Sequence, residues 1–249
     1  MKIARVRRKE ATNVGAHHRK SKTGHLSLSR AERDYLDTCF HEATHAVVGI
    51  AEGLKLSDRG VFAYDPRYPA DRFAMKMAGA TGLTTWDKGS YETVEERDPL
   101  SLVNMGRAPE VHLQNLPWID KHLLSRVTSS DKKHNEALLS RISPDDLDAV
   151  QKLFIEFDLL KDPAEVSLFS TQFLLALPSI KEAIDEVAKR LHEKKRLFDA
   201  EVREILIHSF ESNSKADLEC LRVHSDITEK QHFESTTQWI EEIKKGGQR

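Results

Sequence analysis

Residues 40–49 read Phe-His-Glu-Ala-Thr-His-Ala-Val-Val-Gly and contain the pattern His-Glu-x-x-His. If this stretch is helical, His41 and His45 lie one turn apart on the same face of the helix. Two imidazoles in this arrangement can bind one zinc ion, and the Glu42 carboxylate beside them can take a proton from water at the metal. The pattern therefore predicts a Zn²⁺ site with His41 and His45 as ligands and Glu42 as the catalytic general base.

The surrounding residues predict that this helix is buried. Residues 35–51 form the most apolar stretch of the first half of the chain. Histidines and a glutamate are costly to bury without partners, which disfavours a helix that carries them by chance. Residues 29–32 read as a capping box that begins the helix, and Gly53 is a natural stop. Cys39 is expected to be a small buried side chain rather than a ligand.

Length and composition suit a globular protein without a membrane segment. The chain has 249 residues, 39% hydrophobic and 31% charged, which fits one large or two small domains. No apolar run approaches the roughly 20 residues that span a bilayer, and no apolar segment near the N-terminus resembles a secretory signal. Two cysteines make no disulfide framework. These features predict a cytoplasmic location.

Charge is distributed unevenly along the chain. Residues 1–30 carry nine Lys and Arg and one acid, whereas the remainder carries 29 basic and 39 acidic residues. A segment so basic and so poor in apolar residues is expected to be disordered in isolation, and we assign residues 1–28 to a basic arm. The arm is either a solvated tail or a binding segment, and its possible partners are a nucleic acid contacted through residues 1–30, an acidic protein, or the acidic remainder of this chain. The Arg-rich, acid-poor composition would also suit an organelle transit peptide, but the arm has no clear amphipathic apolar face.

The remaining patterns predict an α+β fold that is mostly helical. Three short segments read as strands of a small sheet beside the site helix: 60–64, 73–77 and 82–86. Helices are expected from Pro99, where Pro109 should end, kink or restart the helix, and over 119–127 and 132–142. Further helices are expected to start near 143, 162 and 179 and to cover 197–210, with a last short helix docked by Trp239 and ended by residues 246–247.

A catalytic zinc requires a third protein ligand, and spacing alone leaves several candidates. A third histidine six residues after His45 does not occur, because Ala51 stands there. A glutamate from a later helix and an aspartate at the head of a helix are both possible, and a later histidine could replace the aspartate or support it. The candidates are Glu92, Glu95, Glu96, Glu110, Asp131 and His134.

Several segments together resemble the protease domain of the FtsH-type AAA+ metalloproteases. Residues 40–49 match its zinc motif, including the aromatic residue before the first histidine and the final glycine. Residues 82–84 resemble its Gly-x-Thr strand beside the active site, and residues 105–110 its Gly-Arg-Ala-x-Glu helix segment. Residues 128–131 stand where that family places an aspartate ligand, and residues 187–206 are similar to its closing helix pair. The resemblance covers about residues 28–208.

The resemblance implies a zincin-like metallopeptidase domain over residues 29–210, with a small sheet beside the active-site helix and a polar helical extension over 211–249. It implies Asp131 as the third zinc ligand. This sequence departs from the family at Thr44, usually glycine, and at Pro109, usually a helical residue, and it lacks the family's Asn-Asp-Leu at the aspartate. It also carries no ATPase module, so a substrate would need an exposed or unfolded segment or a partner unfoldase.

These observations predict a zinc-dependent metalloendopeptidase that works without ATP hydrolysis of its own. Its substrate is expected to be a protein or peptide whose extended backbone pairs with the strand at Leu83, Thr84 and Thr85. The alternative is a regulatory or nucleic-acid-associated protein on a metallopeptidase fold, in which the zinc is structural or the site is silent.

Overall fold

The computed structural model describes residues 28–116, 129–141, 163–223 and 225–246. Its strands are β1 (Leu56–Ala63), β2 (Gly82–Trp86) and β3 (Arg196–Leu197). Its helices are α1 (Arg30–Ala51), α2 (Pro69–Ala78), α3 (Lys88–Arg97), α4 (Pro99–Gln114), α6 (Ser129–Leu139), α8 (Pro163–Ala176), α9 (Pro178–Lys194), α10 (Asp199–Arg222) and α11 (Glu229–Gly246). The expected α+β fold with mostly helical content is confirmed at this level.

Helix α1 forms the centre of the molecule. It begins with the expected capping box, in which Glu32 N donates to Ser29 Oγ and Ser29 N donates to Glu32 Oε2. It ends at Ala51, and Gly53, two residues later, has a φ of 94°, which is left-handed backbone that favours glycine. Every residue from Asp37 to Ala51 is buried. The hydroxyl of Thr44 donates to the Phe40 carbonyl at 2.7 Å, which satisfies a polar group inside the core.

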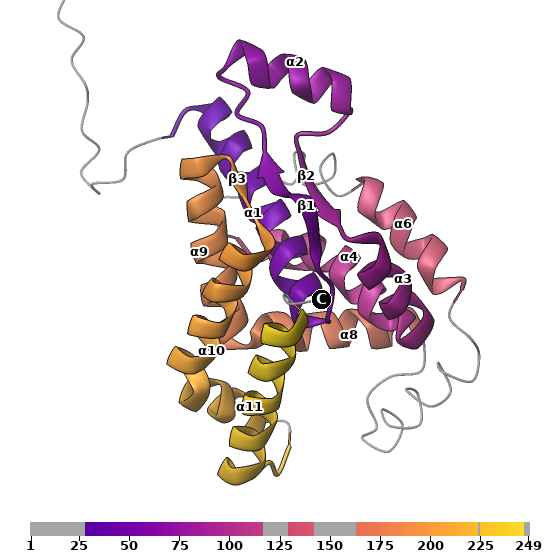
Figure 1. Ribbon diagram of the computed structural model, residues 1–249, viewed down its shortest axis with the longest axis vertical. Coiled ribbons are helices and arrows are strands. Elements are labelled where there is room, and N and C mark those ends of the chain that lie inside the picture. Colours follow the sequence, from indigo (N-terminus) through magenta and orange to yellow (C-terminus); the bar gives the residue numbers. More distant parts are fainter. Residues whose placement is uncertain (1–27, 117–128, 142–162, 224, 247–249) are drawn as a thin grey trace, which may run out of the picture.

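The sheet is small and antiparallel, with strand order β2-β1-β3. Register pairs Val61 with Thr84 on one side and with Leu197 on the other. Both β1 and β2 pack against α1, as Figure 1 shows. Because β2 is an edge strand among the described residues, its outer backbone groups face away from the sheet. The expected strand at 82–86 is confirmed, and the one near 60–64 begins earlier, at Leu56.

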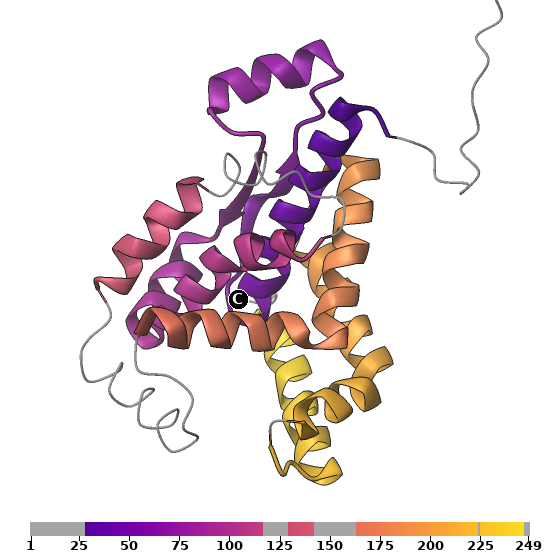
Figure 2. The same cartoon turned by 180° about the vertical axis from the view of Figure 1, so that it is seen from behind.

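The helices cover α1 from two sides. Helices α9 and α10 pack together on one side, and α4 packs on the other with α6 and α8 against it (Figures 1 and 2). Buried apolar side chains of α1, α4, α9, α10 and the sheet form one cluster. This core fixes α1 relative to both the sheet and α4.

The strand expected at 73–77 is wrong, because these residues belong to α2. Pro69 occupies the first turn of this helix, and Gly79 ends it with a φ of 70°. Ala, Met, Lys and Arg favour helix, so these end signals and propensities outweigh a short alternation of large and small residues. All residues of α2 are described and none is buried. Both views show α2 beyond the end of the sheet (Figures 1 and 2).

Pro109 neither ends nor restarts the helix, because α4 runs from Pro99 to Gln114 with Pro109 inside it. Pro109 is buried, as are its neighbour Ala108 and most of the helix. Packing of α4 against α1, α6 and α8 therefore maintains the helix where the local sequence favours a break.

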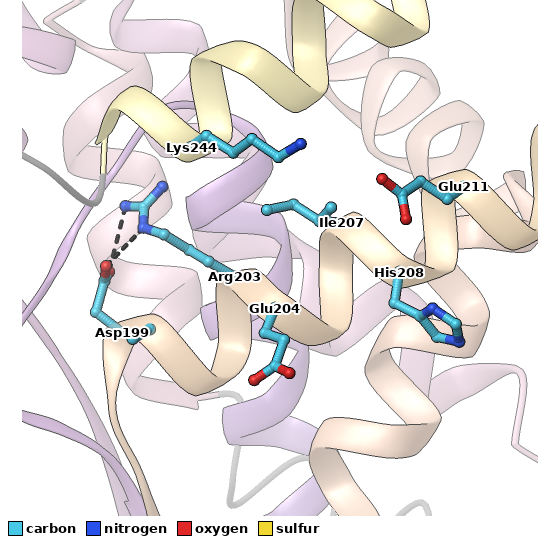
Figure 3. A pocket seen from close by; sticks show the side chains of 8 residues that line it. Asp199, Arg203, Glu204, Ile207, His208, Glu211 and Lys244 are labelled. Atoms are coloured by element: carbon cyan, nitrogen blue, oxygen red, sulfur yellow. Dashed lines mark hydrogen bonds and ion pairs between the residues drawn. The ribbon is translucent and has the colours of Figure 1, made fainter.

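The C-terminal helix is docked on the core by two side chains. Arg203, 5% exposed, donates to the carbonyls of Leu54 and Ile243 at 2.8 and 2.9 Å and pairs with Asp199 (Figure 3). Trp239 Nε1 donates to the Ala51 carbonyl at 3.0 Å. The docking by Trp239 is confirmed, although α11 is longer than expected. The expected domain boundary between residues 210 and 211 falls within α10.

Several expectations concern residues outside the described ranges. These are residues 1–27 of the basic arm, the helix over 119–127 and the helix start near 143. They stay predictions. In the described part of the chain, no helix combines the length and apolar character required to cross a bilayer.

Candidate metal centre

The two histidines of α1 lie together in the core. His41 is 5% exposed and His45 is 8% exposed. Their ring centroids are 4.8 Å apart and the ring planes are nearly perpendicular, at 87°. The four-residue spacing on an α-helix produces this proximity. Two buried imidazoles on one helix face form a donor pair that suits zinc.

The orientation of His45 is fixed by α4. His45 Nδ1 lies 3.1 Å from the carbonyl oxygen of Met105. Because a carbonyl only accepts hydrogen bonds, the proton in this bond is on Nδ1. In the neutral ring the lone pair is then on Nε2. A backbone or carboxylate acceptor on the second nitrogen is the usual support of a metal-binding histidine, and Met105 supplies one here.

The Glu42 carboxylate is held between α1 and β2. Glu42 is 5% exposed, and Thr84 Oγ1 donates to its Oε2 at 2.8 Å. A Cβ atom on Gly82 would lie 2.6 Å from Glu42 Cγ and 2.9 Å from Oε1. Only glycine at position 82 therefore lets β2 approach the helix so closely. This contact places the edge strand directly beside the expected general base.

Most candidates for the third ligand either pair with another side chain or are exposed. Glu92 pairs with Lys88 at 3.4 Å, and Glu95 pairs with Arg141. Glu96 and His134 are exposed, and the Nε2 atom of His134 lies 3.2 Å from the Tyr91 hydroxyl. Among side chains that the structure describes, no three of the His, Cys, Asp and Glu type are grouped as metal ligands. Neither His134 nor the half-buried Glu110 is therefore grouped with the two histidines.

Asp131 is the one candidate ligand whose side chain position is not described. It lies in the first turn of α6, and its side chain is outside the described part. Its position precedes Asn135 by four residues, one turn along the same helix face. Asn135 is 4% exposed and packs on Gly106, where a Cβ atom would lie 2.1 Å from Asn135 Oδ1. Gly106 directly follows Met105, so this contact holds α6 close to the residue that orients His45.

The side chains of the expected substrate strand differ in their exposure and in their contacts. Leu83 is 39% exposed. The Thr84 hydroxyl contacts Glu42, and the Thr85 hydroxyl donates to the Gly60 carbonyl at 2.7 Å. Neither threonine hydroxyl is thus directed to a substrate. What β2 offers a peptide is its backbone at the sheet edge.

Cys39 has the expected environment. It is 0% exposed, and burial raises the pKa of its thiol to about 12. The thiolate, which is the form that binds metals, is thereby disfavoured. Cys39 is a core side chain of α1.

Sequence reasoning missed two groups that shape this site, the Met105 carbonyl and Asn135, and it included Gly106 in a motif without anticipating the contact between Gly106 and Asn135. A backbone acceptor leaves no signal in a sequence, and the packing of a glycine against an asparagine 29 positions later becomes apparent only in the fold. The groove of about 530 Å³ shown in Figure 3, between α10 and α11, is lined by none of the predicted site residues.

Comparison of the chain with protein-family models, with curated proteins and with solved structures finds no match. The geometry of the site and its chemistry therefore carry the functional argument.

Proposed function

We propose that this protein is a zinc-dependent metalloendopeptidase of zincin-like fold. The observation that carries the proposal is the buried triplet on α1: His41 and His45 with adjacent rings, and Glu42 between them in sequence. Two imidazoles one turn apart on a buried helix face, with a glutamate after the first, are the arrangement that binds one zinc ion beside a general base. The Met105 carbonyl supports this role, because it leaves the lone pair of His45 on Nε2.

Each residue has a defined task in this proposal. His41, His45 and Asp131 would hold the ion. When bound, zinc lowers the pKa of a water towards about 7 and polarises a scissile carbonyl. Glu42 accepts a proton at Oε1, the oxygen to which Thr84 does not donate, and passes it to the leaving amine. Thr84 restricts the rotation of the Glu42 carboxylate by donating to Oε2.

The surface around β2 favours an extended peptide with apolar residues as substrate. An added strand can pair with the edge of β2, which passes Glu42. Helix α2 leads into β2 and exposes Phe73 and Met77, 67% and 71% respectively, on one helix face. A peptide that extends past Gly82 would approach these side chains. Unfolded protein segments combine an extended backbone with exposed apolar side chains, as this surface requires.

Cleavage of an unfolded protein tests the proposal. The zinc-loaded chain is incubated with a permanently unfolded model protein and with a folded one, and fragments are identified by mass spectrometry. We expect cleavage of the unfolded protein, loss of cleavage with a chelator and recovery with zinc. A chain that holds zinc yet cleaves no unfolded protein or peptide would assign the metal a structural role.

A further inference from the structure

Pro109 creates an unusual hydrogen-bonding position inside α4. In an α-helix the N–H of each residue donates to the carbonyl four residues earlier. Proline has no N–H, and its ring crowds that carbonyl, so the helical donor for the Met105 carbonyl is missing. Helix α4 nevertheless continues to Gln114.

The carbonyl that loses its helical donor is the one that orients His45. His45 Nδ1 lies 3.1 Å from Met105 O in a buried contact. Met105 is 4% exposed, and Pro109 is buried beside it in α4. With any other residue at position 109, a backbone N–H would be directed at the same oxygen, and the imidazole would share this acceptor with a second donor.

We propose that Pro109 is a positioning residue for His45. By removing a backbone donor, it reserves the Met105 carbonyl for His45 Nδ1–H and fixes Nε2 as the metal-binding nitrogen. The proline would act on a bound metal only through Met105 and His45. The part of this inference that concerns zinc rests on the proposed function, whereas the part that concerns the His45 tautomer does not.

Pro109→Ala tests the proposal, with Pro99→Ala as the matched control. Pro99 begins the same helix, where the first N–H groups have no helical acceptor in any case. We expect Pro109→Ala to weaken zinc binding about tenfold, in the range of changes to groups that support metal ligands. Pro99→Ala is expected to leave the affinity unchanged. A competition titration against a zinc chelator measures both.

Nitrogen chemical shifts of the His45 ring in the metal-free chain provide the second readout. We expect the Nδ1–H form in the natural sequence and a mixture of the two tautomers in Pro109→Ala. An unchanged tautomer in Pro109→Ala overturns the proposal, even if zinc affinity falls, because the fall would then come from repacking. If the natural chain binds no zinc, the proposed function fails, and the tautomer comparison still decides the role of Pro109.

Discussion

Replacing Glu42 by glutamine is expected to reduce kcat for peptide hydrolysis by about 10²–10⁴-fold while zinc remains bound, because the amide cannot accept the proton of the attacking water. The change is nearly isosteric, which matters because β2 lies against this side chain at Gly82. The amide oxygen can still accept from Thr84. Fold and metal content should therefore be preserved.

Initial rates on a quenched peptide, with zinc content measured on the same samples, check this prediction. Glu92→Gln is the matched control, since it makes the same chemical change on the exposed surface of α3. Full activity in zinc-loaded Glu42→Gln would eliminate Glu42 as the base. Equal loss in both variants would point to a cause outside the site.

The second large effect is expected from Gly106→Ala. The added Cβ atom would lie 2.1 Å from Asn135 Oδ1, and Asn135 is a short, buried side chain with little freedom to move away. We expect α6 to shift from α4, with a loss of about 1–3 kcal/mol in the free energy of unfolding, as is typical of overpacking. If Asp131 is a ligand, zinc affinity should fall by at least about tenfold, because α6 carries that residue.

Urea unfolding and a chelator competition measure the two quantities. The double variant Gly106→Ala with Asn135→Ala removes the colliding amide and should restore most of both losses, as a double-mutant cycle would show. A destabilised Gly106→Ala variant with unchanged zinc affinity would contradict a ligand on α6.

Sequence patterns correctly predicted those helices and strands that are determined by the residues within them. The capping box at Ser29, the helix that carries His41 and His45, and the strand at 82–86 are confirmed for this reason. The alternation over 73–77 gave a wrong prediction because a run of so few residues can show the period of a strand by chance. The helix signals at Pro69 and Gly79 were stronger. Helix α3 and strand β3 were not anticipated.

The supports of the site lie beyond sequence reasoning because they are contacts between distant segments. The Met105 carbonyl and His45 are 60 positions apart, and Thr84 is 42 positions from Glu42. The helix rule for Pro109 predicted disruption, but the rule describes an isolated helix. In the folded chain, packing keeps α4 intact, and the unpaired carbonyl acquires a partner from another helix. The zinc ion and the assignment of Asp131 stay predictions.

The central claim is that α1 carries a zinc site, and elemental analysis of the purified protein tests it most directly. The natural chain is compared with His45→Ala and Asp131→Ala after zinc loading and removal of excess metal. We predict one zinc per natural chain and its loss from both variants. Loss from His45→Ala alone would retain the site but move the third ligand away from Asp131. A folded natural chain without zinc after loading would contradict the claim.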